Sequence, residues 1–155
     1  MANLTAPLAE RNLTVQSPYP TRLRLKASEV VHKGAYLTIE TGQNRVRNLN
    51  TADTAASYAG IAAESAVGGA ADGDVLIEVW RNCEEMVLTS QIGSAPIIGA
   101  SVFVGDNNGL DGSATTGLNT VTGAGGGTRI KIGEITSQQG AYTIFKHITA
   151  LAPVA

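Results

Sequence analysis

The chain has 155 residues, a formal net charge of −2 and only 15% charged residues. This length suits one domain, which buries roughly 70% of the surface that the unfolded chain exposes. So small a net charge excludes the strongly basic or acidic character expected of a protein that binds nucleic acid, an anionic membrane or a highly charged substrate. A surface of neutral polar residues and glycine is typical of a soluble β domain, or of a domain that lies against another protein.

Residues 1–21 differ in pattern from the rest of the chain. They contain three prolines, which favour extended backbone, and their apolar residues follow neither helix nor strand periodicity. We therefore expect an extended arm that becomes ordered on a partner, the alternative being a disordered terminus. The start of the chain lacks the basic region and apolar run of a signal peptide, and a lone cysteine, Cys83, forms no internal disulfide. Both features indicate synthesis in a cytoplasm.

From Arg22 onward, apolar and polar residues alternate in short segments separated by turns rich in Gly, Asn and Asp. The strongest predicted strand is Asp74–Trp80, and Asp106–Gly109 has the composition of a tight turn. Further strands are predicted at 22–27, 36–40, 59–64, 86–89, 101–104, 129–132 and 142–148. The last two form a predicted antiparallel hairpin. Ile135 falls out of phase with Ile132 after Gly133, which suggests a β-bulge.

Two segments do not fit the strand pattern. Thr51–Tyr58 is the best candidate for a short helix, because Thr51 or Asp53 can cap an Ala-rich turn. Residues 111–127 consist mainly of Gly, Thr, Ser, Ala and Asn, and we expect a mobile surface loop.

About seven to nine short antiparallel strands with regular turn signals predict an all-β domain, either a small β-sandwich or a small β-barrel, over residues 22–149. Residues 150–155 form a short C-terminal tail. Alternation alone does not separate a sandwich from a barrel.

Groups suited to catalysis are few. A catalytic triad needs Ser or Cys beside His and a carboxylate, and no local motif joins Cys83 with His32 or His147. We expect Cys83 to be an inert thiol and each histidine an ordinary residue at a strand edge. Glu84 and Glu85 are adjacent on a strand and point to opposite faces, so they do not flank one bond. We therefore expect a protein that is not an enzyme.

Metal and cofactor sites are not expected either. Two histidines and one cysteine do not give the spacing of zinc ligands. The segment from Asp106 to Asp111 lacks the glycine at the sixth position and the acidic residue at the twelfth that a calcium loop has, so a tight turn is favoured.

The order of the strand segments carries a family resemblance. A small-residue strand at Tyr58–Ala62 is followed by Asp72–Trp80, by Ile98–Asp106, which contains the pattern Gly-x-x-Val-x-Val-x-Asp, and by Lys131–Ile135 with its Ile-Gly pair. Over roughly residues 22–149, this arrangement resembles the capsid decoration, or cement, proteins of tailed bacteriophages. The arm at 1–21 and the segment 111–127 depart from that pattern.

The resemblance implies a structural virion protein, made in the host bacterial cytoplasm, that binds the outer surface of the expanded capsid and links neighbouring major capsid subunits. The implied partners are the major capsid protein and other copies of this chain, commonly as a homotrimer, without nucleic acid or membrane. We expect the arm to contact the capsid or a neighbouring subunit through Leu4, Leu8, Leu13, Val15 and Tyr19. The alternatives are a carbohydrate- or receptor-binding β module on a virion surface and a hydrolase that uses Cys83 with a histidine.

Overall fold

The computed structural model describes residues 4–7, 11–15, 19–40, 42–50, 56–94, 96–110, 117–121 and 129–149. Within these ranges the chain forms twelve strands and one 3-10 turn at Thr89–Gln91, and no α-helix. The all-β prediction is confirmed. The strands outnumber the seven to nine expected because several are only two or three residues long, too short to show alternation in the sequence.

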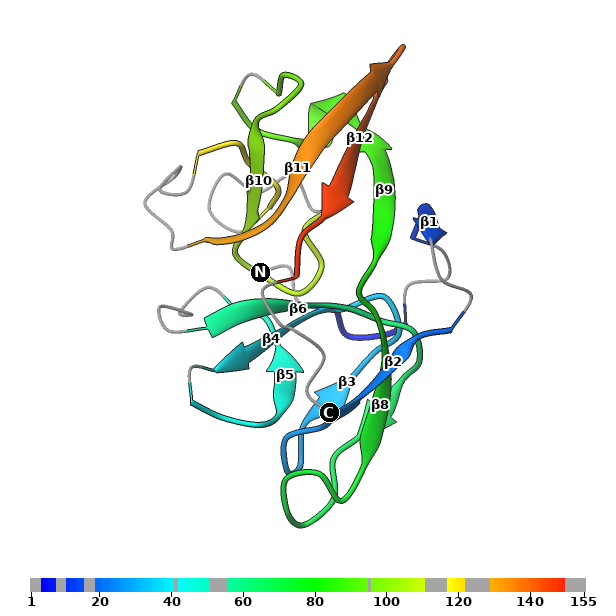
Figure 1. The fold of residues 1–155 in the computed structure, drawn as a ribbon, viewed down its shortest axis with the longest axis vertical. Coiled ribbons are helices and arrows are strands. Elements are labelled where there is room, and N and C mark those ends of the chain that lie inside the picture. The colour runs from blue at the N-terminus through cyan, green and yellow to red at the C-terminus, as the bar shows by residue number, and fades with distance from the viewer. Residues whose placement is uncertain are drawn as a thin grey trace.

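The strands form two five-stranded antiparallel sheets and a small third one (Figure 1). The first sheet has the order β1 (Leu13–Val15), β9 (Cys83–Leu88), β12 (Tyr142–His147), β11 (Ile130–Gln139), β10 (Ser101–Val104). The second has the order β2 (Thr21–Arg24), β8 (Leu76–Trp80), β6 (Ala56–Ala62), β4 (Tyr36–Glu40), β5 (Val46–Asn48). The third pairs β3 (Val30–Val31) with β7 (Ala66–Val67). Neither large sheet is closed into a barrel, although a bridge between Leu25 and Val46 joins the edges of the second at one point.

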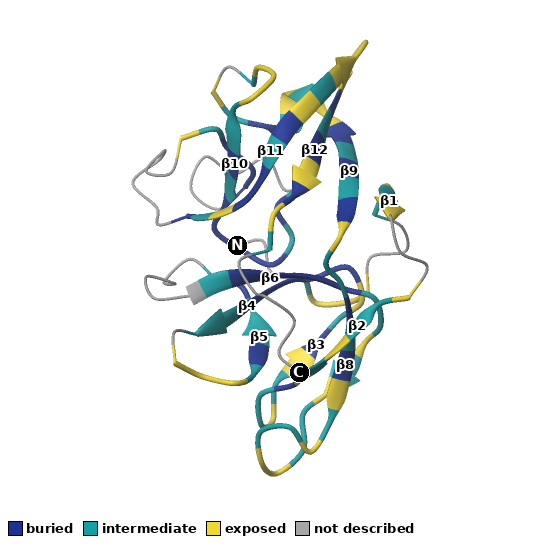
Figure 2. Cartoon of the chain, in the orientation of Figure 1, coloured by how far each residue is buried: buried dark blue, intermediate teal, exposed yellow. Residues whose placement is uncertain are grey.

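The second sheet contributes side chains to two separate cores. On one face it packs against the first sheet, where Tyr36, Tyr58 and Ile61 meet residues such as Ile132 and Phe145. The second core combines side chains from the opposite face of this sheet with Val31 of β3 and with residues that adjoin the strands: Leu25, Val31, Ala35, Leu37, Val46, Ala59, Ala62, Ile77 and Val79. Because successive strand residues point to opposite faces, Tyr36 and Leu37 enter different cores. Strand β4 is therefore buried on both faces at its start and not half-buried as the sequence predicted (Figure 2).

A β-bulge in β6 directs its side chains into these two cores. Leu37 pairs with Gly60 and Thr38 with Tyr58, which leaves Ala59 as the extra residue. The bulge shifts the alternation by one position, so Tyr58 and Ile61, three residues apart, face the same core. Gly60 has φ +133°, and a Cβ there would lie 2.4 Å from the carbonyl oxygen of Trp80. Only glycine allows β6 and β8 to approach this closely.

Three further sequence predictions were tested by the fold. The antiparallel hairpin of β11 and β12 is confirmed. The bulge near Gly133 is also confirmed, because Val102 pairs with Gly133 and Phe103 with Lys131, so that one residue is left over. The predicted helix is wrong for Ala56–Tyr58, which belong to β6; Thr51–Ala55 lie outside the described residues. Pairing with β4 and β8 overrides the helical preference of an Ala-rich segment.

In the segment 111–127, where a mobile surface loop was predicted, the structure describes residues 117–121, and the first three of these are buried and not on the surface. Leu118 is buried in the first core, and Asn119 exchanges backbone hydrogen bonds of 2.8 and 2.9 Å with Phe103. The remaining residues of that segment lie outside the described ranges. Asp106 accepts hydrogen bonds from the backbone N–H groups of Asn108 and Gly109, which is the tight turn that the sequence predicted.

Replacing Gly60 tests the bulge. Gly60→Ala should destabilise the protein by at least about 2 kcal/mol more than Gly42→Ala, because the new methyl group must displace backbone. Gly42 is a matched control: it too has a positive φ, +78°, but a Cβ there meets nothing within 4 Å. Urea unfolding of both variants measures the difference. Equal losses would contradict the close approach of β6 and β8.

Candidate functional site

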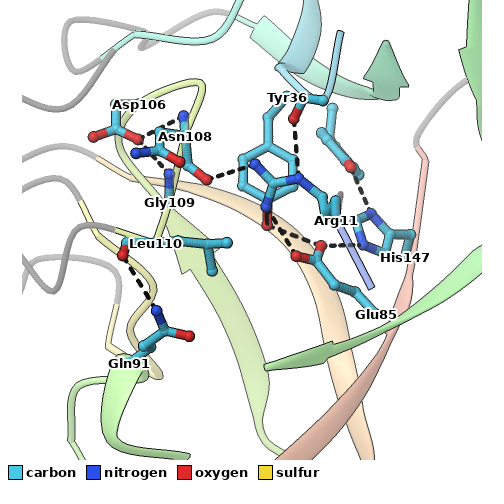
Figure 3. A network of polar contacts seen from close by, with 11 residues as sticks. Arg11, Tyr36, Glu85, Gln91, Asp106, Asn108, Gly109, Leu110 and His147 are labelled. Atoms are coloured by element: carbon cyan, nitrogen blue, oxygen red, sulfur yellow. Dashed lines mark hydrogen bonds and ion pairs between the residues drawn. The ribbon is translucent and has the colours of Figure 1, made fainter. Parts of the chain in front are cut away.

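The main cluster of buried polar and ionisable side chains lies between the two large sheets (Figure 3). Its five members come from five separate parts of the chain: Arg11 just before β1, Tyr36 in β4, Tyr58 in β6, Glu85 in β9 and His147 in β12. Tyr36, Tyr58, Glu85 and His147 are all almost fully buried, and the side chain of Arg11 is only 2% exposed. We call this set the buried network.

Glu85 is the centre of the buried network. Its Oε2 accepts a hydrogen bond of 2.8 Å from Nη1 of Arg11, and its Oε1 accepts hydrogen bonds of 2.9 Å from Tyr36 Oη and from His147 Nε2. The alternation of β9 explains its position, because Cys83, Glu85 and Val87 point inward while Glu84 does not. The prediction that Glu84 and Glu85 point to opposite faces is confirmed.

Arg11 enters the network from the N-terminal arm. Its guanidinium donates to the carbonyl oxygens of Gly34 (3.0 Å) and Asn108 (2.7 Å) and to Tyr36 Oη (2.8 Å), as well as to Glu85. Its Cζ also lies 4.2 Å from the centre of the Tyr36 ring, a cation–π contact. The arm is thus fixed by one side chain that reaches four different residues of the main domain.

The proton positions follow from the hydrogen-bond partners. An ionised carboxylate only accepts, so Nε2 of His147 carries a hydrogen and donates to Glu85. The other ring nitrogen, Nδ1, forms a hydrogen bond of 2.5 Å with Tyr58 Oη. Tyr36 accepts from Arg11 and donates to Glu85. Each side chain of the buried network is therefore hydrogen-bonded to at least one other member, as a buried polar cluster requires.

Electrostatics keep the network in this state. Burial by itself disfavours the charge on Glu85, but Arg11 and His147 outweigh burial and lower the pKa of this carboxyl to about 2. Burial raises the pKa of Tyr36 and of Tyr58 well above 10, so both phenols keep their protons. Glu85 and Arg11 thus form a fixed pair of opposite charges in the interior.

His147 is the last residue of β12, but it is not the ordinary residue that was expected, because it is buried and bonded to Glu85 and Tyr58. His32 follows β3 and is half-buried.

Cys83 is buried, and burial together with the charge of Glu85 raises the pKa of its thiol to about 12. An inert thiol was expected, and a pKa this high keeps the nucleophilic thiolate scarce. The described residues contain no group of three or more His, Cys, Asp or Glu side chains arranged to hold a metal ion.

The residues predicted to contact a partner lie in different environments. Leu4 packs against the second core and Leu13 against the first, so both contact their own chain. Val15 is 36% exposed and Tyr19 81% exposed, and Leu8 lies outside the described residues. The predicted contact with a capsid or a neighbouring subunit stays a prediction for all five. The strand β1 itself was not predicted, since three residues are too few to show alternation.

Sequence reasoning missed Arg11, Glu85 and His147 as a group. A signal was present for Glu85, which occupies the inward-facing phase of a strand between Cys83 and Val87. A carboxylate in that position indicates a buried partner of opposite charge, because an unpaired buried charge is very costly.

Comparison of the chain with protein-family models, with curated proteins and with solved structures returns no match. Among the described residues, no helix has the length and apolar character needed to cross a membrane.

Removal of Arg11 tests the buried ion pair. Arg11→Met should lower the free energy of unfolding by about 3–5 kcal/mol, because it leaves the charge of Glu85 buried without a counter-ion. Adding Glu85→Gln should restore part of this loss, since the amide oxygen still accepts hydrogen bonds and carries no charge. The control is Arg22→Met, which removes an exposed arginine 3.8 Å from Glu78 and should cost less than about 1 kcal/mol. Equal losses in Arg11→Met and Arg22→Met would contradict the account.

The stability difference between the wild type and Glu85→Gln should depend on pH. The pKa of Glu85 is about 2 in the folded protein against an ordinary 4.5, so the unfolded state binds the proton more readily. The contribution of the carboxylate is fully present above about pH 4.5 and disappears as the pH falls through 2, a change of about 3 kcal/mol. Urea unfolding of both proteins between pH 6 and pH 2 measures it. Parallel curves would show that Glu85 is not held ionised by its partners.

Proposed function

We propose that this protein is a structural virion protein that binds the outer surface of an expanded phage capsid and joins neighbouring major capsid subunits. The observation that supports this proposal most concerns the described residues: their ionisable cluster is buried, and some of their apolar side chains are grouped on the surface. The ionisable cluster is enclosed and its members bond to one another, whereas six of the exposed apolar side chains fall into two separate groups.

The interior favours a role in holding structure together. Glu85, Tyr36, Tyr58 and His147 use their hydrogen-bonding groups on one another and on Arg11, with almost no exposure to solvent. A substrate has no access to groups that are buried and satisfied in this way. Burying charges costs desolvation free energy, but a fully hydrogen-bonded buried network holds the fold in one rigid shape, which suits a structural protein.

The first exposed apolar group lies at the far end of the first sheet. Leu88 on β9 and Tyr142 on β12 are directly opposite each other, and both are exposed. The exposed Ile97 and Ile98 precede β10, and a hydrogen bond from Gln138 to the carbonyl oxygen of Pro96 ties their segment to β11. We call these four residues the distal apolar group.

The second exposed group is the valine pair, Val30 and Val67, which lie opposite each other on β3 and β7. This small sheet lies in the lower half of the molecule in Figure 1, whereas the turn between β11 and β12 marks the opposite end of the long axis. Exposed apolar side chains grouped in this way are typical of protein contacts. Two separated groups suit a protein that touches two neighbouring subunits at once.

The assembly that we infer combines the major capsid protein with several copies of this chain, most simply a homotrimer. Linking weak contacts in one oligomer raises the overall affinity through effective concentration. Binding only the expanded shell stabilises that form of the shell by mass action. Neither step needs a cofactor, a nucleic acid or a membrane.

A pelleting assay with capsids of the encoding phage that lack this protein tests the proposal. Wild-type protein should pellet with the capsids in a saturable manner and raise their disruption temperature. The double variant Leu88→Ser, Tyr142→Ser should bind more weakly, because it removes the centre of the distal apolar group. The matched control is Leu76→Ser, which removes an exposed leucine of the second sheet outside both groups.

Absence of saturable binding, or binding that leaves the disruption temperature unchanged, would contradict the capsid role. In that case a glycan array would test the carbohydrate-binding alternative directly.

A further inference from the structure

We propose that the pocket occupied by Arg11 is a receptor for the N-terminal arm of a second copy of this chain, so that copies in an oligomer exchange arms. The receptor consists of the carbonyl oxygens of Gly34 and Asn108 with the side chains of Tyr36 and Glu85. This inference concerns contacts between copies and does not rest on capsid binding.

The receptor belongs entirely to the main domain. The residues that contact Arg11 lie at positions 34, 36, 85 and 108, all beyond the arm. The backbone of the arm adds β1, which pairs with β9, and Asn12, whose carbonyl oxygen accepts from the N–H of Met86 at 3.0 Å. An arm from another copy makes the same contacts. An oligomer in which each arm binds another copy therefore has almost the same contact free energy as separate chains in which each arm binds its own domain. This near equality is the condition for exchange of an element between protomers.

The receptor specifies a guanidinium. Its acceptors lie in different directions around Arg11: two carbonyl oxygens, a phenol oxygen and a carboxylate oxygen. The planar guanidinium has five N–H donors in a fixed fork, which serve these acceptors together, whereas an ammonium group has three on one atom. Glu85 is fully buried, so an empty receptor leaves an unpaired charge. The site therefore stays filled by some copy's Arg11.

Besides Arg11, two parts of the arm contact the main domain, and another copy's arm can make the same contacts: Leu4, whose N–H donates to Asn107 Oδ1 at 2.8 Å and whose side chain packs against the second core, and β1. Strand β1 has only three residues and lies at the edge of its sheet, with β9 as its one neighbour. The connection to β2 is Gln16–Pro20, which contains Pro18 and Pro20. Five residues of fully stretched chain span at most about 17 Å.

Disulfide trapping tests the exchange in the full-length chain. Thr14 on β1 and Glu84 on β9 are directly opposite, and opposite residues of an antiparallel pair have Cα atoms about 4.5–5.5 Å apart, within the range that a disulfide spans. Both side chains lie away from the core. In a Cys83→Ala background, one chain carries Thr14→Cys and the other carries Glu84→Cys. The two chains are unfolded, mixed, refolded together at high concentration and oxidised.

Arm exchange predicts a disulfide-linked species of two chains in the mixture, formed in clear excess over either chain alone. The matched control replaces Glu84→Cys by Glu134→Cys, an exposed glutamate of β11 that does not face the arm. This control should give little product. Equal product with Glu134→Cys would mean random collision and would overturn the proposal.

A single chain that carries both Thr14→Cys and Glu84→Cys gives the complementary result. If it oxidises completely within one chain while the mixture of single variants gives no two-chain species, the arm closes only on its own domain and the proposal is wrong. Cooperative thermal unfolding of each variant shows that the chains are folded. Because no capsid is present, either result leaves the capsid proposal to its own pelleting assay.

Discussion

A carboxylate buried between two β-sheets is the constraint on which much of this structure depends. Glu85 is withdrawn from water, and a buried charge is tolerated only where an opposite charge and hydrogen bonds surround it. Arg11 supplies the charge, and Tyr36 and His147 supply further hydrogen bonds. Since these groups come from β4, β12 and the arm, one ion pair links both sheets to the N-terminal segment. The arm is therefore part of the folded domain in this structure.

This arrangement separates the polar interior from the exposed apolar side chains of the surface. The buried network fixes the relative position of the two sheets, and with it the distance between the distal apolar group and the valine pair. A protein that joins two neighbouring subunits of a shell benefits from such rigidity, because a flexible link does not hold them at one spacing. The arm is held by Arg11, by the pairing of β1 with β9 and by the packing of Leu4 and Leu13, and all of these contacts are with residues of the main domain.

The sequence was sufficient to predict those elements in which one face is apolar and the other polar. Alternation located β2, β8 and β12, and the loss of phase after Gly133 located a bulge. It located β4 but not its two-sided burial, because Tyr36 and Leu37 enter different cores. In β6 it located the second half, whereas Ala56–Tyr58 were predicted to be helical because their strand form depends on pairing with neighbouring strands. The buried network escaped prediction for a different reason. Arg11 and Glu85 are 74 residues apart, and nothing local in either segment indicates that they meet.

Hydrogen exchange at the backbone N–H of Met86 tests the central claim most directly, because this group donates to Asn12 of the arm. The N–H of Leu49, which donates to Tyr36 in the centre of the domain, provides the reference. If the Arg11–Glu85 pair makes the arm an integral part of the fold, both groups should exchange only through global unfolding, with the same free energy of opening. Exchange at Met86 with a far lower free energy than at Leu49, as in a frayed terminus, would contradict the account.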